Sequence, residues 1–374
     1  MKVLQLTKFY PPVRGGIETT TYELTEGINR QGLQADVLCS NECASTVRER
    51  APSGYQIVRA ASAGRVLSVS IAPALVTEVR RLARDYGIIH VHMPDPMAAL
   101  ALWLVKPAAR VVLHWHSDVI RQRVTRRLYQ PLQDWLVKRA DAIIATTLVY
   151  ADASVALRPW MSKVHVIPIG ISDPRRGVCP ERVNAIRAGY PGKQIVLGLG
   201  RMTYYKGFDV LIRAARLLPA NAQVLIGGSG YLFEQCQREI DELGLQDKVQ
   251  LLGPLSEDDL VNHYAAADVF CLPSTARSEA FGVAMLDAMA MSKPIVSTDI
   301  EGSGVPWINQ NGVTGITVPV GEPEPLAHAL RKLLDDDALA ACCGHAGRKR
   351  YAESFTAECM TRQVIDLYRH LVPH

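Results

Sequence analysis

The sequence predicts an α/β protein built from two doubly wound parallel sheets. Short β-branched runs alternate with helix-length amphipathic segments along the 374 residues, which is the pattern that strand–helix–strand units produce. A chain of that length exceeds one ordinary hydrophobic core, so two domains are expected. The alternation pauses over residues 168–192, which are rich in Pro, Gly and Arg and are typical of a connection.

The predicted strands set the domain boundaries. In the first half they lie at residues 2–6, 35–39, 56–60, 88–92, 110–114, 142–146 and 164–167. In the second half they lie at residues 194–199, 223–226, 249–252, 269–272, 294–297 and 315–318. Helical patterns occupy residues 18–31, 72–86, 126–140 and 338–371. The expected organisation is a first domain, a linker, a second domain and a terminal helix packing back on the first domain, at residues 1–170, 171–192, 193–354 and 355–374.

The composition indicates a globular protein, expected in the cytoplasm. Hydrophobic residues make up 48% of the chain and charged residues 21%, and no apolar run approaches a membrane span. The N-terminus enters a strand at once, without a signal-peptide pattern. The net charge of +4 fits anionic small ligands and argues against nucleic acid as a partner. The eight cysteines include no C-x-x-C pair, so packed thiols are expected.

One stretch, Arg121–Arg139, combines basic residues with Leu and Trp in a helical pattern. Such a pattern fits a solvated helix face, and it also fits peripheral contact with anionic lipid at the inner face of the cytoplasmic membrane. The acidic residue Asp134 within the stretch favours the solvated face.

Two carboxylates near residue 280 are the strongest indication of a ligand site. Residues 283–291 are apolar except for Asp287, and a carboxylate buried in a helix must be paired or bound. Glu279 precedes this predicted helix, where backbone N–H groups and the helix dipole attract anions. N–H donors for phosphate beside carboxylates for hydroxyls suit a nucleotide-sugar.

Glycines and cations follow the first strand of the second half. Gly200 allows close backbone approach to a ligand, and Arg201 and Lys206 add positive charge suited to a diphosphate. Two solvated surface cations are the alternative interpretation. Gly228 and Gly253 end later strands, and for Gly228 a helix-start turn is at least as good an explanation as ligand contact.

The first half offers a second glycine pair. Gly15 and Gly16 follow the first strand and precede a predicted helix, with Glu18 in its first turn. Free N–H groups there could approach phosphate or a sugar. Ordinary helix capping explains the same residues about equally well.

Histidines occur as two pairs, His90 with His92 and His114 with His116. The two-residue spacing places each pair on one face of a strand. A four-histidine metal site is one hypothesis, but the apolar flanking sequence and the lack of a nearby Cys favour core or cleft histidines without metal. His116 lies where its strand ends and is the best placed to reach a ligand.

Together these motifs resemble the retaining nucleotide-sugar glycosyltransferases of family four, whose GT-B fold has two Rossmann-like domains facing across a cleft. The resemblance covers nearly the whole chain and follows the family's order. The glycine loop, the cleft histidine, the diphosphate-binding pair and the E-x7-E element correspond to Gly15-Gly16, His116, Arg201 with Lys206, and the segment containing Glu279, Phe281, Gly282 and Asp287.

The resemblance implies a role for each of these residues. Arg201 and Lys206 would hold the diphosphate and stabilise its charge as it leaves. Glu279 would bind hydroxyls of the transferred sugar, and nearby N–H groups would meet that sugar or the phosphate. Asp287 stands where the family has Glu, one methylene longer, so its contact with the ribose would be longer or bridged by water.

The resemblance also implies the reaction, which is hexosyl transfer with retention, by front-face attack and without a metal or other cofactor. The donor would be a nucleotide-diphosphate sugar, with GDP-mannose favoured and a UDP-sugar as the alternative. The acceptor would be a glycan or a lipid-linked saccharide, as in bacterial polysaccharide and lipopolysaccharide synthesis. Two other functions stay open, a nucleotide-sugar epimerase on the same fold and a non-catalytic sugar-nucleotide-binding protein.

Overall fold

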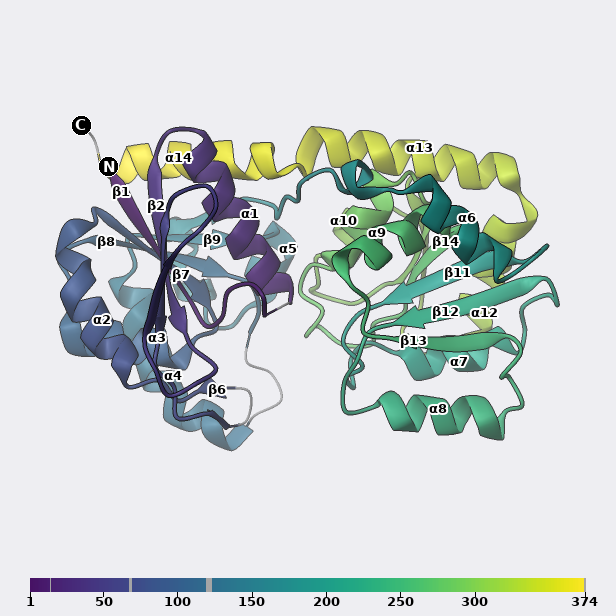
Figure 1. The fold of residues 1–374 in the computed structure, drawn as a ribbon, viewed down its shortest axis with the longest axis horizontal. Coiled ribbons are helices and arrows are strands. Elements are labelled where there is room, and N and C mark those ends of the chain that lie inside the picture. The colour runs from purple at the N-terminus through teal and green to yellow at the C-terminus, as the bar shows by residue number, and fades with distance from the viewer. Residues whose placement is uncertain (14, 67–68, 119–122, 373–374) are drawn as a thin grey trace. The chain divides into compact units, whose positions relative to one another are not determined.

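The computed structural model describes residues 1–13, 15–66, 69–118 and 123–372, and it divides into two compact units (Figure 1). Unit 1 consists of Met1–Ser172 and Thr356–His374, and unit 2 of Asp173–Phe355. Each unit is a largely or wholly parallel sheet with helices on both faces. The predicted fold class of two Rossmann-like α/β domains is therefore confirmed.

The main sheet of unit 1 has eight strands in the order β10-β9-β8-β7-β1-β2-β4-β3. Their bounds are β1 Lys2–Thr7, β2 Gln34–Ser40, β3 Val47–Arg50, β4 Gln56–Ala60, β7 Ile88–Met93, β8 Arg110–Trp115, β9 Ala142–Ala145 and β10 Val164–Val166. Only β3 runs antiparallel, against β4. The sequence did not predict β3 because its residues, VRER, are all exposed and carry no apolar alternation. A separate antiparallel pair joins β5 Arg65–Val66 to β6 Val69–Ser70.

Two layers of helices cover this sheet (Figure 1). The α-helices of unit 1 are α1 Gly16–Arg30, α2 Ala74–Leu82, α3 Pro96–Val105, α4 Arg123–Arg139, α5 Leu148–Ala153 and α14 Ala357–Leu371. Helices α1 and α14 pack together over an apolar part of the sheet that includes Val3, Ile88 and Val112. Helices α2, α3 and α4 form a second contiguous layer.

The C-terminal helical stretch, expected as one run over residues 338–371, is two helices. Helix α13, Asp337–Ser354, belongs to unit 2, and α14 belongs to unit 1. The helical run is interrupted at Phe355, because Thr356 caps the N-terminus of α14. The Thr356 hydroxyl accepts a hydrogen bond from the Cys359 N–H. Thr356 also pairs with Ile171. A Cβ on Gly170 would lie 2.1 Å from the Thr356 carbonyl oxygen, so only glycine at position 170 lets the two segments lie close enough to pair.

Unit 2 contains a six-stranded, wholly parallel sheet in the order β13-β12-β11-β14-β15-β16. The strands are β11 Gln194–Leu199, β12 Ala222–Gly227, β13 Val249–Gly253, β14 Val269–Leu272, β15 Ile295–Thr298 and β16 Gly315–Val318. The helices besides α13 are α6 Pro180–Ala188, α7 Phe208–Ala215, α8 Phe233–Glu242, α9 Glu257–Ala266, α10 Ala284–Ala290, α11 Val305–Ile308 and α12 Pro323–Asp335.

The expected linker over residues 171–192 is almost absent, because unit 2 already begins at Asp173. Its Pro-rich sequence starts helix α6, with Pro180 in the first turn, where the missing N–H has no consequence. Helix α6 packs on α9, and the Cys179 N–H donates to the Asn262 side chain at 2.8 Å. Arg187 forms an ion pair with Asp268 at 2.7 Å.

Helices α1 and α14 cross at a glycine. A Cβ on Gly27 would lie 2.1 Å from Thr361 Oγ1 and 3.1 Å from Thr361 Cβ. In an open helix, Ala is about 1 kcal/mol more favourable than Gly. We therefore predict the opposite sign here: Gly27→Ala should lower the free energy of unfolding of unit 1 by about 1–3 kcal/mol, because the crossing becomes overpacked.

Urea unfolding monitored by hydrogen exchange of α1 and α14 measures this effect. Adding Thr361→Ala to Gly27→Ala should recover part of the loss, since the nearest atom is removed. Gly87→Ala is the matched control, because a Cβ there meets nothing closer than 3.9 Å. A stabilised Gly27→Ala variant would contradict the close crossing.

Candidate functional site

Three loops at the carboxyl ends of neighbouring strands form the candidate site of unit 2. They span residues 200–207 after β11, 227–231 at the end of β12 and 273–282 after β14. Strand order reverses between β11 and β14, since the chain passes outward through β12 and β13 and then returns to the other side. Ligands of open α/β sheets bind at such a switch point.

Glycines bring the first two loops into backbone contact. The Gly200 N–H donates to Gly227 O at 3.1 Å, and the Met202 N–H donates to Ser229 O at 2.9 Å. A Cβ on Gly228 would lie 1.9 Å from Gly200 O. Gly228, whose N–H also bonds Gly253 O at 2.7 Å, thus has a packing role that accounts for its presence without a ligand.

A second set of contacts joins the 200–207 loop to the 273–282 loop. The Thr275 N–H donates to Tyr205 O at 2.7 Å, and the hydroxyls of Tyr204 and Ser278 lie 2.7 Å apart. Gly207 has φ 66°, and a Cβ there would lie 2.0 Å from Pro273 O. Because of these contacts, residues far apart in the sequence lie side by side.

The two loops are joined by a nearly buried ion pair. Lys206 Nζ lies 2.6 Å from Glu279 Oε2, and each side chain is 10% exposed. The hydroxyl of Ser274 donates to the same carboxylate oxygen at 2.9 Å. Gly200 leaves room for the Lys206 stem, since a Cβ there would come within 2.9 Å of Lys206 Cε. Glu279 Oε1 has no hydrogen-bond partner among the described residues and can accept from a ligand.

Arg201 lies beside this pair in sequence, directly after Gly200. Its side chain is exposed, and within the described part of the chain its guanidinium has no hydrogen bond or ion pair. An exposed guanidinium beside a buried ammonium offers two kinds of contact to a diphosphate, a bidentate fork and a point charge.

The segment after Glu279 contributes backbone more than side chain. The Phe281 ring is buried against Phe355, with ring centroids 6.1 Å apart, so this side chain belongs to the core. Gly282 has φ 87°. Among the described residues, the N–H groups of Phe281, Gly282 and Val283 have no backbone acceptor. Such donors could bind the transferred sugar or the phosphate, as the sequence predicts, and this role remains a prediction.

Asp287 is half-buried in the short helix α10. Burial, together with the Asp287 charge, holds the pKa of Tyr264 above its ordinary value. Ser274 and Ser303 were not among the predicted site residues, although Ser303 donates to the Glu279 carbonyl. Their signal in the sequence was weak, since serine is ordinary in loops.

In unit 1, the predicted residues lie at the carboxyl ends of β1 and β8. Gly16 begins α1, and Gly15 is its N-cap without a side-chain cap. A Cβ on Gly15 would meet only the end of the Glu18 side chain, which can turn away, so packing does not require glycine here and its ligand role stays a prediction. His116 follows β8 and is 6% exposed.

All four histidines form one buried stack across β7 and β8. Neighbouring rings are 4.2–5.4 Å apart, and His114 and His116 are the closest pair, inclined by 15°. His92 bonds His116 Nε2 through Nδ1 and Gln5 Oε1 through Nε2, both at 2.9 Å. Tyr368 of α14 bonds His90 Nδ1. Gln5 and Tyr368 were missed, although a polar residue within the apolar strand β1 was a usable signal.

This geometry favours a hydrogen-bonded stack over a metal site. Ring nitrogens of His90, His92 and His114 lie within 4.8 Å of one another, close enough to consider an ion. However, both His92 nitrogens are engaged in hydrogen bonds. Nearly parallel rings also direct their lone pairs side by side, whereas metal ligands converge on one point.

Comparison with known proteins identifies the class that the two sheets and their loops define. Residues 14–175 match the family described as "Glycosyltransferase Family 4", and residues 184–350 match the family described as "Glycosyl transferases group 1". The chain belongs to the family-four glycosyltransferases and is a glycosyltransferase. Among the described residues, no helix is both long and apolar enough to cross a membrane.

Particular relatives share nearly the whole chain. The O-antigen chain mannosyltransferase C of Escherichia coli is 31% identical, covering 100% of this chain and 99% of its own. The D-rhamnosyltransferase WbpZ of Pseudomonas aeruginosa is 32% identical, covering 96% and 93%. Anabaena HepE, crystallised with UDP-glucose, shares the fold with a TM-score of 0.82 at 20% identity, covering 99% and 100%.

The buried histidines predict acid sensitivity of unit 1. Burial lowers the pKa of His90, His92 and His116, and it lowers that of His114 to about 3. Because the folded pKa lies below the unfolded value of about 6.5, stability is complete above pH ~6.5 and falls as the pH drops below it. Each histidine should contribute a slope of about 1.4 kcal/mol per pH unit.

Urea unfolding between pH 7.5 and 5, monitored by hydrogen exchange of β7 and β8, measures that slope. His114→Leu should reduce the slope by the contribution of one histidine. His328→Asn, at an exposed position in unit 2, should leave the slope unchanged. A slope unaffected by His114→Leu would contradict the neutral stack.

Proposed function

We propose that the enzyme transfers a hexosyl unit, most simply mannosyl, with retention from a nucleotide-diphosphate sugar to a glycan or lipid-linked saccharide. The observation that carries the donor class is the Lys206–Glu279 ion pair beside the exposed Arg201 at the switch point of unit 2. Mannosyl, and with it GDP-mannose, is favoured because a full-length relative is an O-antigen chain mannosyltransferase. The UDP-glucose in HepE keeps a UDP-sugar as the alternative.

Each group has one task in this proposal. Arg201 and Lys206 bind the diphosphate and stabilise the charge that develops on it as it leaves. Glu279 Oε1 accepts from a sugar hydroxyl, while Oε2 stays bonded to Lys206 and Ser274. Asp287 accepts from the ribose. Gly200 and Gly253 keep the loops in place, and the free N–H groups around Gly282 meet the sugar or phosphate.

The proposed bond changes need no further reactant. The bond between the anomeric carbon and the phosphate oxygen breaks, and an acceptor hydroxyl forms the new bond on the same face of the sugar. The hydroxyl proton passes to the departing phosphate oxygen. Preorganised cations lower the barrier because they stabilise charge where it accumulates.

Removing the Glu279 charge tests the site. Glu279→Gln keeps the side-chain size and an acceptor for Ser274, yet loses the carboxylate. We predict at least a 100-fold fall in kcat, the magnitude typical of one preorganised contact at a developing charge. The free energy of unfolding of unit 2 should also fall, because the Lys206 ammonium loses its buried partner. Glu242→Gln, exposed on α8, is the matched control.

Donor identity is established first, by thermal shift with GDP-, UDP-, ADP- and dTDP-sugars, since a bound donor raises apparent stability. Product analysis then follows with and without a saccharide acceptor. Unimpaired transfer by Glu279→Gln would refute the site assignment. Appearance of an epimerised nucleotide-sugar in the absence of acceptor would instead support the epimerase alternative.

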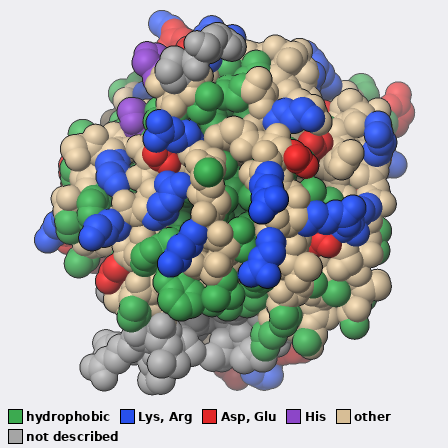
Figure 2. Space-filling view, turned by 90° about the vertical axis from the view of Figure 1, so that its left-hand side faces the viewer, with side chains coloured by type: hydrophobic (Ala, Val, Ile, Leu, Met, Phe, Trp, Pro, Cys, Tyr) green, Lys and Arg blue, Asp and Glu red, His purple; other side chains and the backbone are tan. Residues whose placement is uncertain are grey.

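We also propose a peripheral contact with anionic lipid, placed differently from the sequence analysis. Of the predicted stretch Arg121–Arg139, residues 121–122 and the side chains up to 128 lie outside the described residues. A groove of about 820 Å³ lies instead at the amino ends of β7 and β8. Its lining holds four cations and no carboxylate, namely Arg80, Arg84, Lys106 and Arg110. Figure 2 shows a face on which Lys and Arg side chains surround apolar surface.

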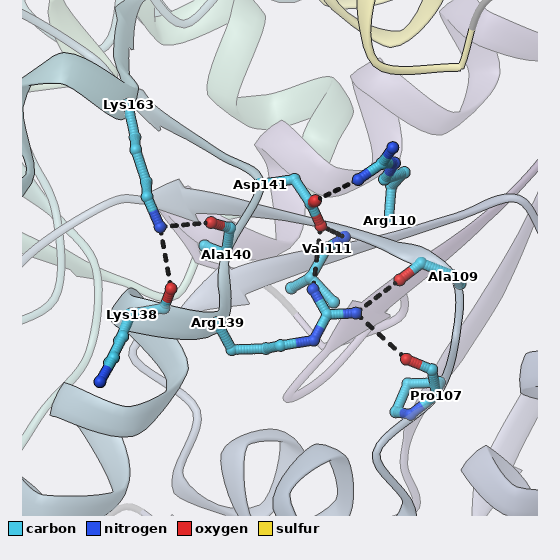
Figure 3. A network of polar contacts seen from close by, with 9 residues as sticks. All are labelled: Pro107, Ala109, Arg110, Val111, Lys138, Arg139, Ala140, Asp141 and Lys163. Atoms are coloured by element: carbon cyan, nitrogen blue, oxygen red, sulfur yellow. Dashed lines mark hydrogen bonds and ion pairs between the residues drawn. The ribbon is translucent and has the colours of Figure 1, made fainter.

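Part of this positive charge is structural. Helices α2, α3 and α4 end near this edge of the sheet, and cations there offset the negative ends of their dipoles. Arg139 donates to the carbonyls of Pro107 and Ala109, and Lys163 to those of Lys138 and Ala140 (Figure 3). Asp141 binds Arg110 at 2.8 Å.

The remaining charge is available to a partner. Within the described residues, Arg80, Arg84 and Lys106 form no ion pair. Leu104, which lines the same groove, is 47% exposed, and its neighbour in the sequence, Trp103, is 45% exposed. Exposed apolar side chains together with cations fit the interface of an anionic membrane.

Vesicle binding tests this surface. The double variant Arg84→Gln and Lys106→Gln should weaken binding to phosphatidylcholine–phosphatidylglycerol vesicles roughly 30-fold at low salt, at about 1 kcal/mol per charge. The control, Arg331→Gln with Lys332→Gln on α12, should not. Equal binding by both variants, or no binding of the natural chain at low salt, would contradict the proposal.

A further inference from the structure

The hydrogen bonds of the histidine stack run through three strands and one helix. They connect His116 after β8 to His92 on β7, His92 to Gln5 on β1, and Gln5 to Tyr368 on α14. Strands β1 and β7 are neighbours at the switch point of the unit 1 sheet, because the chain leaves β1 in one direction and returns to β7 on the other side. The network therefore lies where an α/β sheet binds ligands.

The Gln5 amide fixes the direction of these bonds. Its Nε2 donates to the Tyr368 hydroxyl at 3.3 Å, so its Oε1 faces His92 Nε2 at 2.9 Å. A carbonyl oxygen only accepts, and His92 Nε2 must therefore carry the proton.

The proton on His92 then decides the state of His116. A neutral imidazole with a proton on Nε2 has a bare Nδ1, which can only accept. His92 Nδ1 lies 2.9 Å from His116 Nε2, so His116 must donate through Nε2. Burial lowers the pKa of both rings, which keeps them neutral.

Stacking holds the His116 ring in the orientation this bond needs. The ring lies parallel within 15° to His114 and within 14° to His92. Both nitrogens of His114 are buried without a partner in the described part of the chain. His114 therefore supports its neighbours through ring contact alone.

We propose that Gln5 and His92 are positioning residues that hold His116 as the Nε2–H tautomer, so that its bare Nδ1 accepts a hydrogen bond from a saccharide hydroxyl. This inference rests on the proposed function for the nature of the ligand. It assigns His116 an acceptor's role and not that of an acid, because the only ring proton is committed to His92. Selection follows from this arrangement, since a hydroxyl can satisfy Nδ1 and a group without a donor cannot.

Nitrogen-15 NMR of the full chain with labelled histidine reads the tautomer directly and needs no catalysis. His116 should show a protonated Nε2 and an unprotonated Nδ1. On addition of GDP-mannose or methyl α-D-mannopyranoside, the Nδ1 resonance should move upfield as it accepts a hydroxyl proton, while exposed His328 stays unchanged. A proton on Nδ1 would overturn the proposed direction, and a His116 spectrum unaffected by both ligands would overturn the saccharide contact.

Variants separate positioning from general stability. Gln5→Met removes the acceptor at similar size, and it should give a mixture of His116 tautomers and raise the KM for the saccharide about tenfold with kcat little changed. Tyr368→Phe removes the hydroxyl that orients the Gln5 amide and should also give a mixture of tautomers, whereas Gln363→Met, exposed on α14, should preserve the tautomer. An unaltered tautomer in Gln5→Met would contradict the inference. Because the spectrum is independent of turnover, it stays decisive even where Glu279→Gln refutes the proposed function.

Discussion

The ion pair between Lys206 and Glu279 is the interaction on which the candidate donor site depends. Two charges removed from water are costly unless close geometry and further hydrogen bonds compensate, and here the 2.6 Å contact and the Ser274 hydroxyl do so. The pair forms only because two loops touch through backbone, which requires glycine at position 207. The position of the ion pair therefore depends on the position of this glycine.

The parallel sheet separates two kinds of surface. In unit 1, the carboxyl-terminal halves of β1, β7 and β8 carry polar residues such as Gln5 and His92, while the amino-terminal halves carry Val3 and Val112 under α1 and α14. The C-termini of helices lie near the amino ends of these strands, and cations are favoured there because they offset the negative ends of the helix dipoles. Recognition of a saccharide and of a lipid surface would then use opposite ends of one sheet.

Much of the fold could be predicted from the sequence, because buried parallel strands and amphipathic helices have distinct periods. The strand β3 could not be predicted, since its residues, VRER, are exposed and it forms by pairing with β4. The supposed linker had the Pro and Gly content of a connection, yet Pro180 starts a helix. Of the site, Lys206 and Glu279 were predicted singly. Their contact was not, because it depends on loops brought together by the strand order, as does the bond from Gln5 to His92.

The affinity for a free nucleoside diphosphate, measured by calorimetry with GDP and UDP on three chains, tests the central claim most directly. If the loops of unit 2 bind the diphosphate through Arg201, then Arg201→Gln should weaken the affinity at least tenfold, which is the size of one charge-assisted contact at about 1.5–3 kcal/mol. Glu242→Gln, exposed on α8, should leave that affinity intact, because it lies outside the three loops. Unchanged affinity in Arg201→Gln, or an equal loss in Glu242→Gln, would contradict the account.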